Sequence, residues 1–174
     1  MEIYLIRHTT PDIDKGICYG QSDINLVSNY KDEILAVKDK VNTVTFDAVY
    51  TSPLSRCVKL AESIHTTYFK DSRLKELNFG DWELRSWDDI PRDESKLWME
   101  DFVNVSTSNG ESYLALQHRV IEFYKELISK PYKSVAIVTH AGVIRALLSY
   151  VRQIHLKDSF GITVNYGDVI TFNS

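Results

Sequence analysis

One segment, Glu2-Ile3-Tyr4-Leu5-Ile6-Arg7-His8, carries an apolar run that ends on an arginine and a histidine. A second run, Val135-Ala136-Ile137-Val138-Thr139, ends in a similar way on His140-Ala141-Gly142. Short apolar runs of this kind are typical of buried strands in a parallel sheet. The residues that follow such strands lie at the carboxyl edge of the sheet, where α/β proteins bind their ligands. We therefore expect two imidazoles to lie together at one edge of a sheet.

The rest of the chain alternates between strand and helix patterns. Strands are predicted over Glu2–Ile6, Phe46–Tyr50, Arg73–Leu77 and Lys133–Thr139, and two more within Ile162–Phe172 about the turn Asn165–Asp168. Helices are predicted over Ser28–Asn42, from Ser52 to about Tyr68, and over Arg92–Val103, Gly110–Lys130 and Gly142–Gln153. This order favours a single α/β domain over residues 1–174. We expect a three-layer α/β/α sandwich with a mostly parallel central sheet and an antiparallel hairpin at the end.

Two connecting segments suggest binding functions. The segment Thr51-Ser52-Pro53 is expected to begin a helix, with Ser52 as the N-cap and Pro53 in the first helical position. Arg56 then lies in the first turn, where helix amides favour anions. The predicted loop Thr9–Asp23 is long for a compact domain, which indicates a candidate binding loop.

Composition narrows the classes of partner. The net charge is −4 and the basic residues are scattered, so we expect no nucleic-acid partner. No window has the length of a membrane span, and we expect no membrane partner. Cys18 and Cys57 have no metal-ligand spacing, and no basic leader precedes a long apolar segment, so the expected location is the cytoplasm. The expected partner is a small phosphorylated substrate, while the oligomeric state is left open.

The residue types fit phosphoryl transfer without a metal. This chemistry needs donors around the phosphoryl oxygens, an in-line nucleophile and an acid for the leaving oxygen. Arg7 and Arg56 are candidate donors, and His8 and His140 are candidate nucleophiles that spacing alone does not separate. Glu76 is one candidate acid. A zinc site from the two histidines and this glutamate fits by residue type, but two nearby arginines oppose a cation.

Five segments resemble, in the same order, the motifs of the histidine phosphatase superfamily. They are Leu5–Thr9, Thr51–Arg56, Leu74–Glu83, Asn109–Ser112 and Val138–Arg145. Within that superfamily the chain is most similar to the phosphoglycerate mutase-like branch. The segment Lys15–Asp23 is similar to one in the small α-ribazole phosphatases of cobalamin assembly.

The resemblance implies a role for each matching residue. It implies that His8 is the nucleophile that forms a phosphohistidine, and that Arg7, Arg56 and His140 bind the phosphate. It also implies that Glu76 is the proton donor, although Asp81 and Glu83 compete with it on spacing. Gly20 and Gln21 match a loop that approaches the substrate, where the glycine amide could donate to a phosphate oxygen. No cofactor and no metal are expected, and the implied fold is the phosphoglycerate mutase-like sandwich.

Several positions depart from the family pattern. Thr9 stands where the family often has glycine, and its hydroxyl could either bind phosphate or cap a turn. Leu84 also replaces a common glycine, so the loop after Trp82 could bend differently. The segment Pro11–Asp14 places carboxylates where mutases usually present an asparagine, which weakens a mutase interpretation. Arg145 is expected to pair with a carboxylate rather than to touch the substrate.

The expected function is a metal-independent phosphomonoesterase that acts through a phosphohistidine on α-ribazole 5′-phosphate or a similar small monoester. Phosphoglycerate mutase and a phosphoprotein phosphatase are the alternative enzymes. A non-catalytic phosphate-binding module is the least favoured alternative, because every catalytic residue type is present.

Overall fold

The two strands that end on histidines lie next to each other in the middle of a five-stranded sheet. The computed structural model describes residues 1–174. Strand β1 (Glu2–Arg7) runs parallel to β4 (Ser134–Thr139), with Arg7 opposite Thr139. The strand order is β3-β2-β4-β1-β5, in which β2 (Ala48–Thr51) and β3 (Phe69–Lys70) are also parallel. Only β5 (Val169–Asn173) is antiparallel, and it pairs with β1. The mostly parallel sheet is as predicted.

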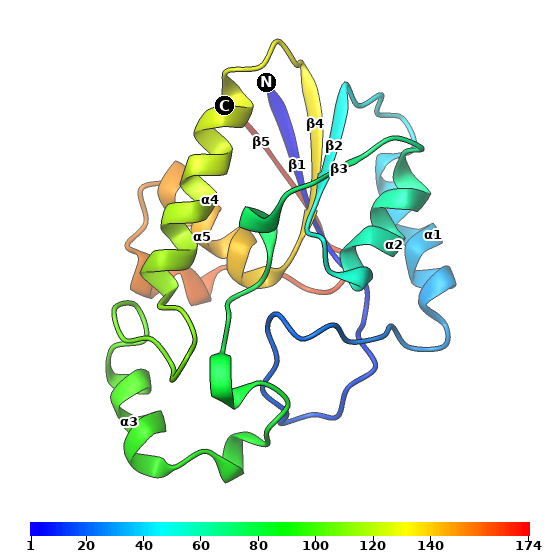
Figure 1. The fold of residues 1–174 in the computed structure, drawn as a ribbon. Coiled ribbons are helices and arrows are strands. Elements are labelled where there is room, and N and C mark those ends of the chain that lie inside the picture. Colours follow the sequence, from blue (N-terminus) through cyan, green and yellow to red (C-terminus); the bar gives the residue numbers. More distant parts are fainter.

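Helices cover both faces of this sheet (Figure 1). Helices α1 (Tyr30–Val41) and α2 (Ser55–Ile64) lie on one face, and α4 (Tyr113–Ile128) and α5 (Ala141–Val151) lie on the other. Helix α3 (Arg92–Glu100) lies apart from these layers and buries none of its side chains fully. The predicted three-layer α/β/α sandwich is confirmed.

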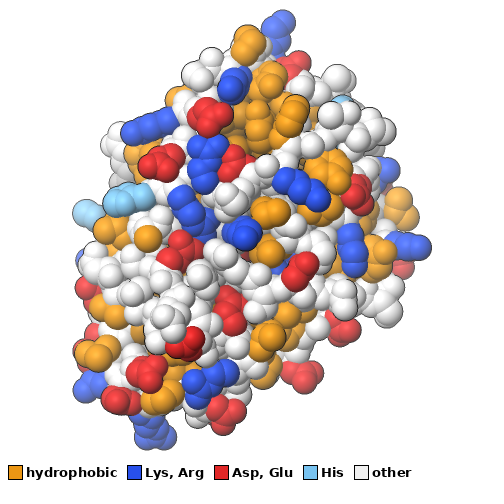
Figure 2. Space-filling view, in the orientation of Figure 1, with side chains coloured by type: hydrophobic (Ala, Val, Ile, Leu, Met, Phe, Trp, Pro, Cys, Tyr) orange, Lys and Arg blue, Asp and Glu red, His pale blue; other side chains and the backbone are white.

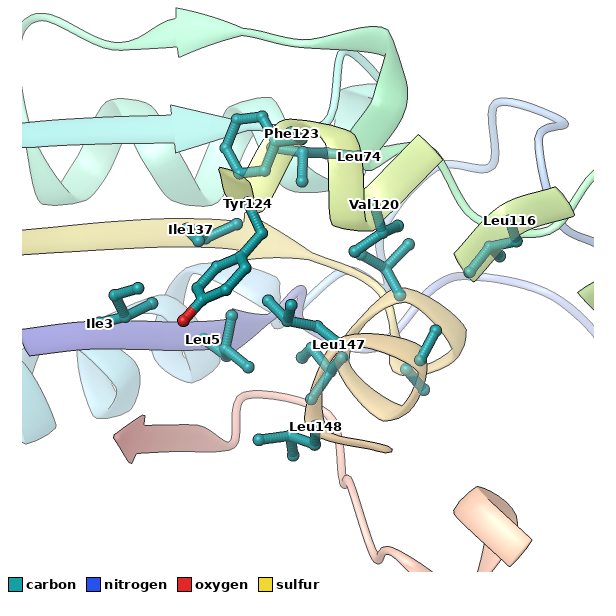
Figure 3. Packing of buried hydrophobic residues seen from close by; sticks show 14 of the residues in the cluster. Ile3, Leu5, Leu74, Leu116, Val120, Phe123, Tyr124, Ile137, Leu147 and Leu148 are labelled. Atoms are coloured by element: carbon teal, nitrogen blue, oxygen red, sulfur yellow. The ribbon is translucent and has the colours of Figure 1, made fainter. Parts of the chain in front are cut away.

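Alternating side chains of the central strands fill two separate cores. Ile3, Leu5 and Ile137 point to the face covered by α4 and α5, where they pack with Phe123 and Leu147 (Figure 3). The adjacent residues along the strands, such as Ile6 and Val138, join the core under α1 and α2. Each fully buried aliphatic side chain of this kind contributes about 1.5–3 kcal/mol to folding. The two cores hold β1 and β4 in fixed register, which fixes the positions of their carboxyl ends.

The predicted strand Arg73–Leu77 is wrong. The chain forms a single 3₁₀ turn at Ser72–Leu74, because the Asp71 side chain accepts a hydrogen bond from the Arg73 amide and caps it. The true strand, β3, lies just before this turn. Thr139 at the end of β4 donates its hydroxyl to the Leu74 carbonyl oxygen at 2.8 Å, which ties the turn to the sheet edge.

The predicted start of the second helix is also wrong. Helix α2 begins at Ser55 with Leu54 as the cap, and it ends at Ile64 rather than Tyr68. The Ser52 hydroxyl contacts His140 instead of capping the helix. Arg56 nevertheless lies in the first turn, as predicted.

The predicted hairpin over Ile162–Phe172 forms only one strand, β5. The first part of that segment is irregular because its carbonyl groups face arginine side chains, with Val164 accepting from Arg7 and Ile162 from Arg145. The other helices lie within about two residues of their predicted ranges, with two exceptions. Helix α3 ends at Glu100, and α4 starts at Tyr113, directly after its N-cap Ser112.

Acidic and basic side chains are interspersed on the face of the molecule drawn in Figure 2. No helix combines the length and the apolar character that crossing a membrane requires.

Candidate active site

His8 lies at the carboxyl end of β1 and is almost fully buried. Its Nδ1 lies 2.7 Å from the Thr9 carbonyl oxygen. A carbonyl oxygen can only accept, so Nδ1 carries the hydrogen and Nε2 keeps its lone pair in the neutral ring. Burial lowers the pKa of His8 well below its ordinary value, and the nearby charge of Arg56 lowers it further. The ring is therefore held as a neutral imidazole with a free Nε2.

His140 follows β4 and lies beside His8, with 5.1 Å between the two ring centres. Its Nε2 is 2.8 Å from the Ser52 hydroxyl oxygen, and the Cys57 sulfur is 3.5 Å from the same nitrogen. Burial lowers the pKa of His140 well below its ordinary value, and the nearby positive charge of Arg56 adds to this effect. The predicted juxtaposition of the two imidazoles is confirmed by this geometry.

Two guanidinium groups flank these rings without any carboxylate partner. Arg7 donates from Nη1 to the Val164 carbonyl oxygen at 2.7 Å. Arg56 is fully buried and donates to the carbonyl oxygens of Ser22 and Gly20. The Nε of each arginine is buried and has no hydrogen-bond partner. Buried cations without counterions are costly, so this pair favours a site that takes up an anion.

Glu76 faces the same space from the segment after the Ser72–Leu74 turn. Its carboxylate accepts from the Leu77 amide at 2.9 Å and from the Gly142 amide, in the first turn of α5, at 3.1 Å. Its backbone carbonyl accepts from the side chains of Gln21 and Arg119, each at 3.0 Å. A side chain on Gly142 would lie 2.2 Å from the Glu76 carboxylate, so this close approach requires glycine. The Glu76 carboxyl group is thus held against the N-terminal end of α5.

Glu83 and Asp81, the competing acids, are engaged elsewhere. The Glu83 carboxylate accepts from the backbone amides of Gly20, Gln21 and Ser22. Burial raises the pKa of Glu83, but hydrogen bonds from Ser22 and from these amides outweigh it and hold the pKa below its usual range. Asp81 is exposed and accepts from Ser108 and Asn109. Among the three acids, only Glu76 lines the same cavity as His8.

The loop residues matched to substrate binding serve other contacts in this structure. The Gly20 amide donates to Glu83, so it is not free for a phosphate oxygen. A Cβ on Gly20 would lie 1.8 Å from the Leu77 carbonyl oxygen, and glycine is needed there for packing. Gln21 reaches the Glu76 backbone rather than the cavity. The Thr9 hydroxyl is buried without a hydrogen-bond partner, so it caps no turn.

A cavity of about 250 Å³ opens beside His8. One part of its wall is polar and contains the histidine, the arginines and Glu76, while the other part is mostly aromatic. The full lining consists of Arg7, His8, Ile17, Tyr19, Arg56, Glu76, Leu77, Phe79, Trp87, Tyr113, Ala141, Gly142, Arg145 and Phe160.

Arg145 is the charged lining residue that sequence reasoning set aside. It donates from Nε to the Ile162 carbonyl oxygen at 2.9 Å, and its guanidinium carbon lies 5.3 Å from the centre of the Phe160 ring. It takes part in none of the ion pairs of the structure, so the expected carboxylate partner is absent. Its spacing of three residues from Gly142 places both on one face of α5. This spacing is the sequence pattern from which the position of Arg145 beside the site could have been predicted.

No group of three or more histidine, cysteine or acidic side chains is arranged to hold a metal ion. The zinc alternative from His8, His140 and Glu76 therefore finds no ligand cluster in this structure.

The sequence of residues 3–173 matches the histidine phosphatase superfamily (branch 1). The chain belongs to this superfamily. It is 28% identical to the adenosylcobalamin/α-ribazole phosphatase of Escherichia coli K12, over 86% of this chain and 78% of that protein. It is 29% identical to the putative phosphoserine phosphatase 2 of Hydrogenobacter thermophilus, over 92% of this chain and 83% of that protein. The family match supports a hydrolase that acts on phosphate monoesters.

Solved structures show the same fold. The α-ribazole phosphatase of Shigella flexneri superimposes with a TM-score of 0.92 at 25% identity, covering 99% of this chain and 90% of that one.

Phosphoglycerate mutases are also similar to this chain in sequence. The 2,3-bisphosphoglycerate-dependent phosphoglycerate mutase of Buchnera aphidicola is 27% identical, covering 98% of this chain and 92% of that protein.

Proposed function

We propose that the chain is a metal-independent phosphomonoesterase that works through a phosphohistidine on His8. The observation that carries this proposal is the neutral, buried imidazole whose Nδ1 is held by the Thr9 carbonyl, beside two arginines that no carboxylate neutralises. Imidazole is nucleophilic when neutral, and the two guanidinium groups offer donors to phosphoryl oxygens. We also propose that His140 donates to the phosphoryl group once the bound anion raises its affinity for a proton.

The proposed reaction has two steps. In the first, Nε2 of His8 attacks phosphorus and the ester P–O bond breaks, while protonated Glu76 gives its proton to the leaving oxygen. In the second, the Glu76 carboxylate takes a proton from water as the water oxygen attacks phosphorus, and the N–P bond breaks to release phosphate. The guanidinium groups of Arg7 and Arg56 stabilise the charge on the three phosphoryl oxygens.

The aromatic part of the cavity supports a substrate with a planar group. Tyr19, Phe79, Trp87 and Phe160 line it, and Trp87 is 39% exposed although it belongs to no core. Flat apolar rings favour a planar leaving portion through stacking. We therefore propose α-ribazole 5′-phosphate, in cobalamin nucleotide-loop assembly in the cytoplasm, or a similar nucleotide-like monoester. The similarity to α-ribazole phosphatases supports this choice.

A second candidate substrate is a phosphomonoester that also carries a carboxylate, such as phosphoserine. Arg145 favours it, because Arg7 and Arg56 already balance a phosphate dianion and a third unpaired guanidinium remains in the cavity. The putative phosphoserine phosphatase among the relatives agrees with this candidate.

Mutase activity is less favoured. The Buchnera mutase aligns over 212 positions, more than the 174 residues of this chain, so the alignment contains mutase segments that this chain lacks. A mutase must keep water from its phosphohistidine while the bound intermediate reorients, which requires a segment that covers the site.

A panel of phosphomonoesters assayed by phosphate release tests these proposals. It contains α-ribazole 5′-phosphate, phosphoserine, 3-phosphoglycerate and a phosphopeptide. We expect the largest kcat/KM with α-ribazole 5′-phosphate and phosphate release rather than isomerisation with 3-phosphoglycerate. Preference for phosphoserine that is lost in Arg145→Gln would select the second candidate. Isomerisation without phosphate release would refute the phosphatase proposal.

A further inference from the structure

Two tyrosines from distant loops meet at the candidate active site. The Tyr19 and Tyr166 hydroxyl oxygens lie 2.8 Å apart, although the residues are 147 positions apart in the sequence. Tyr19 lines the cavity, and the Tyr166 ring centre lies 5.6 Å from that of His8. Neither tyrosine hydroxyl has a role in the reaction described above.

Each of the two rings lies against one of the phosphate-binding arginines. The guanidinium carbon of Arg7 is 3.8 Å from the centre of the Tyr166 ring, a close cation–π stack. The guanidinium carbon of Arg56 is 5.6 Å from the centre of the Tyr19 ring. The two arginines are therefore restrained by two rings that are joined to each other by one hydrogen bond.

The same two loops hold the arginines through their backbones. Val164, two residues before Tyr166, accepts from Arg7, and Gly20, next to Tyr19, accepts from Arg56. Gly167 donates its amide to the His8 carbonyl oxygen at 3.2 Å, which fixes the second loop to the end of β1. The hydroxyl contact is the direct side-chain link between the two loops at this point. Loss of that link would loosen both rings against both guanidinium groups.

We propose that Tyr19 and Tyr166 are a pair of positioning residues that preset Arg7 and Arg56 for the phosphoryl group. An arginine that is already oriented loses less side-chain entropy when it binds an anion, and its donors point to where charge develops. Because the two rings share one hydrogen bond, the pair acts as a unit. The inference rests on the proposed function of this site as a phosphate site.

The test uses Tyr19→Phe, Tyr166→Phe and the double variant, which remove the hydroxyl groups and keep the rings. We measure the dissociation constants of inorganic phosphate and vanadate, and kcat and KM with p-nitrophenyl phosphate. Each single variant should weaken anion binding about three- to tenfold, the range for one lost neutral hydrogen bond. The double variant should lose no more than either single variant, because all three lack the same bond.

Two further variants separate positioning from general structural damage. Tyr68→Phe removes a hydroxyl that donates to Glu62 on α2, away from the cavity, and should leave anion binding unchanged. Tyr166→Leu removes the ring itself and should weaken anion binding about tenfold beyond Tyr166→Phe, since the stack on Arg7 is lost. Melting temperatures of all variants are measured by circular dichroism, and the anion-binding losses should not follow them.

The outcomes separate this inference from the proposed function. Wild-type anion affinity in both Phe variants would overturn the inference and leave the phosphatase proposal intact. Losses that add in the double variant would show that the hydroxyl groups act separately, which also contradicts a pair. Failure of the wild-type protein to bind either phosphate or vanadate would refute the phosphate site and the inference with it.

Discussion

At the scale of single residues, backbone groups set the tautomer and the position of the side chains in the site. The Thr9 carbonyl sets the tautomer of His8, and the Gly142 amide holds one oxygen of the Glu76 carboxylate. An acid and a nucleophile are therefore held in one cavity by contacts that do not depend on the substrate.

Replacement of Glu76 by glutamine tests its role as the general acid. The amide keeps the shape of the side chain but has no acidic proton to transfer to the leaving oxygen. Hydrolysis of alkyl phosphates should fall by about 10²-fold or more, whereas p-nitrophenyl phosphate, whose leaving group needs little protonation, should lose far less. Steady-state kinetics with both substrates measures the difference. Equal losses with the two substrates would assign proton donation to another group.

The sequence identified most of the charged residues of the site through motifs, but not their local partners. The expected phosphate contact of the Gly20 amide could not be judged from the sequence, because Glu83 lies 63 positions away and takes that amide. Arg145 was expected to pair with a carboxylate, yet its partner is the Ile162 carbonyl. Both differences arise from contacts between distant segments, which local patterns do not encode.

At the scale of elements, the strands that end on histidines were predictable because an apolar run is a local pattern that indicates a buried strand. Element ends were harder, because they depend on side chains that serve the site. Ser52 and Pro53 form a good local start for a helix, but the Ser52 hydroxyl contacts His140, and α2 begins at Ser55, two residues after Pro53. Leu74 and Leu77 in the predicted strand Arg73–Leu77 are both buried, a spacing of three that suits a turn better than a strand.

Leu84 explains one departure from the family pattern at this scale. Its φ is 63°, in the left-handed region that favours glycine, and its side chain is 57% exposed. Leu84→Gly should therefore raise the free energy of unfolding by about 0.5–1 kcal/mol, since relief of the strain exceeds the added chain entropy. Urea unfolding monitored by circular dichroism measures the change.

A matched control is Leu35→Gly in α1, where the leucine is also 57% exposed. There glycine should lower the free energy of unfolding by about 1 kcal/mol, because it weakens a helix interior. Loss of stability of similar size in both variants would show that Leu84 is not strained.

At the scale of the whole molecule, two neutral histidines are buried at the edge where both cores end. Burial, followed by nearby positive charge, lowers the pKa of His8 and of His140 below the ordinary value of 6.5. In the unfolded chain both rings take up protons near pH 6.5, whereas in the folded protein they take up protons only at a lower pH. Their contribution to stability is therefore complete above pH 6.5 and is lost as the pH falls below it.

The free energy of unfolding should thus decrease below pH 6.5, by up to about 1.4 kcal/mol per pH unit for each histidine. His8→Asn should reduce this slope, and His118→Asn, which replaces an exposed histidine, should leave it unchanged. Denaturant unfolding at a series of pH values measures the slopes. A slope in His8→Asn equal to that of the wild type would contradict burial of a neutral His8.

The central claim is that a phosphoryl group passes through His8, and rapid quench with radiolabelled substrate tests it most directly. The reaction is quenched under alkaline conditions, digested and mapped by mass spectrometry. We predict label on the peptide containing His8, stable in alkali, lost in acid and absent in His8→Ala, which should release no phosphate. Label on a serine or a cysteine, or full turnover by His8→Ala, would contradict the account.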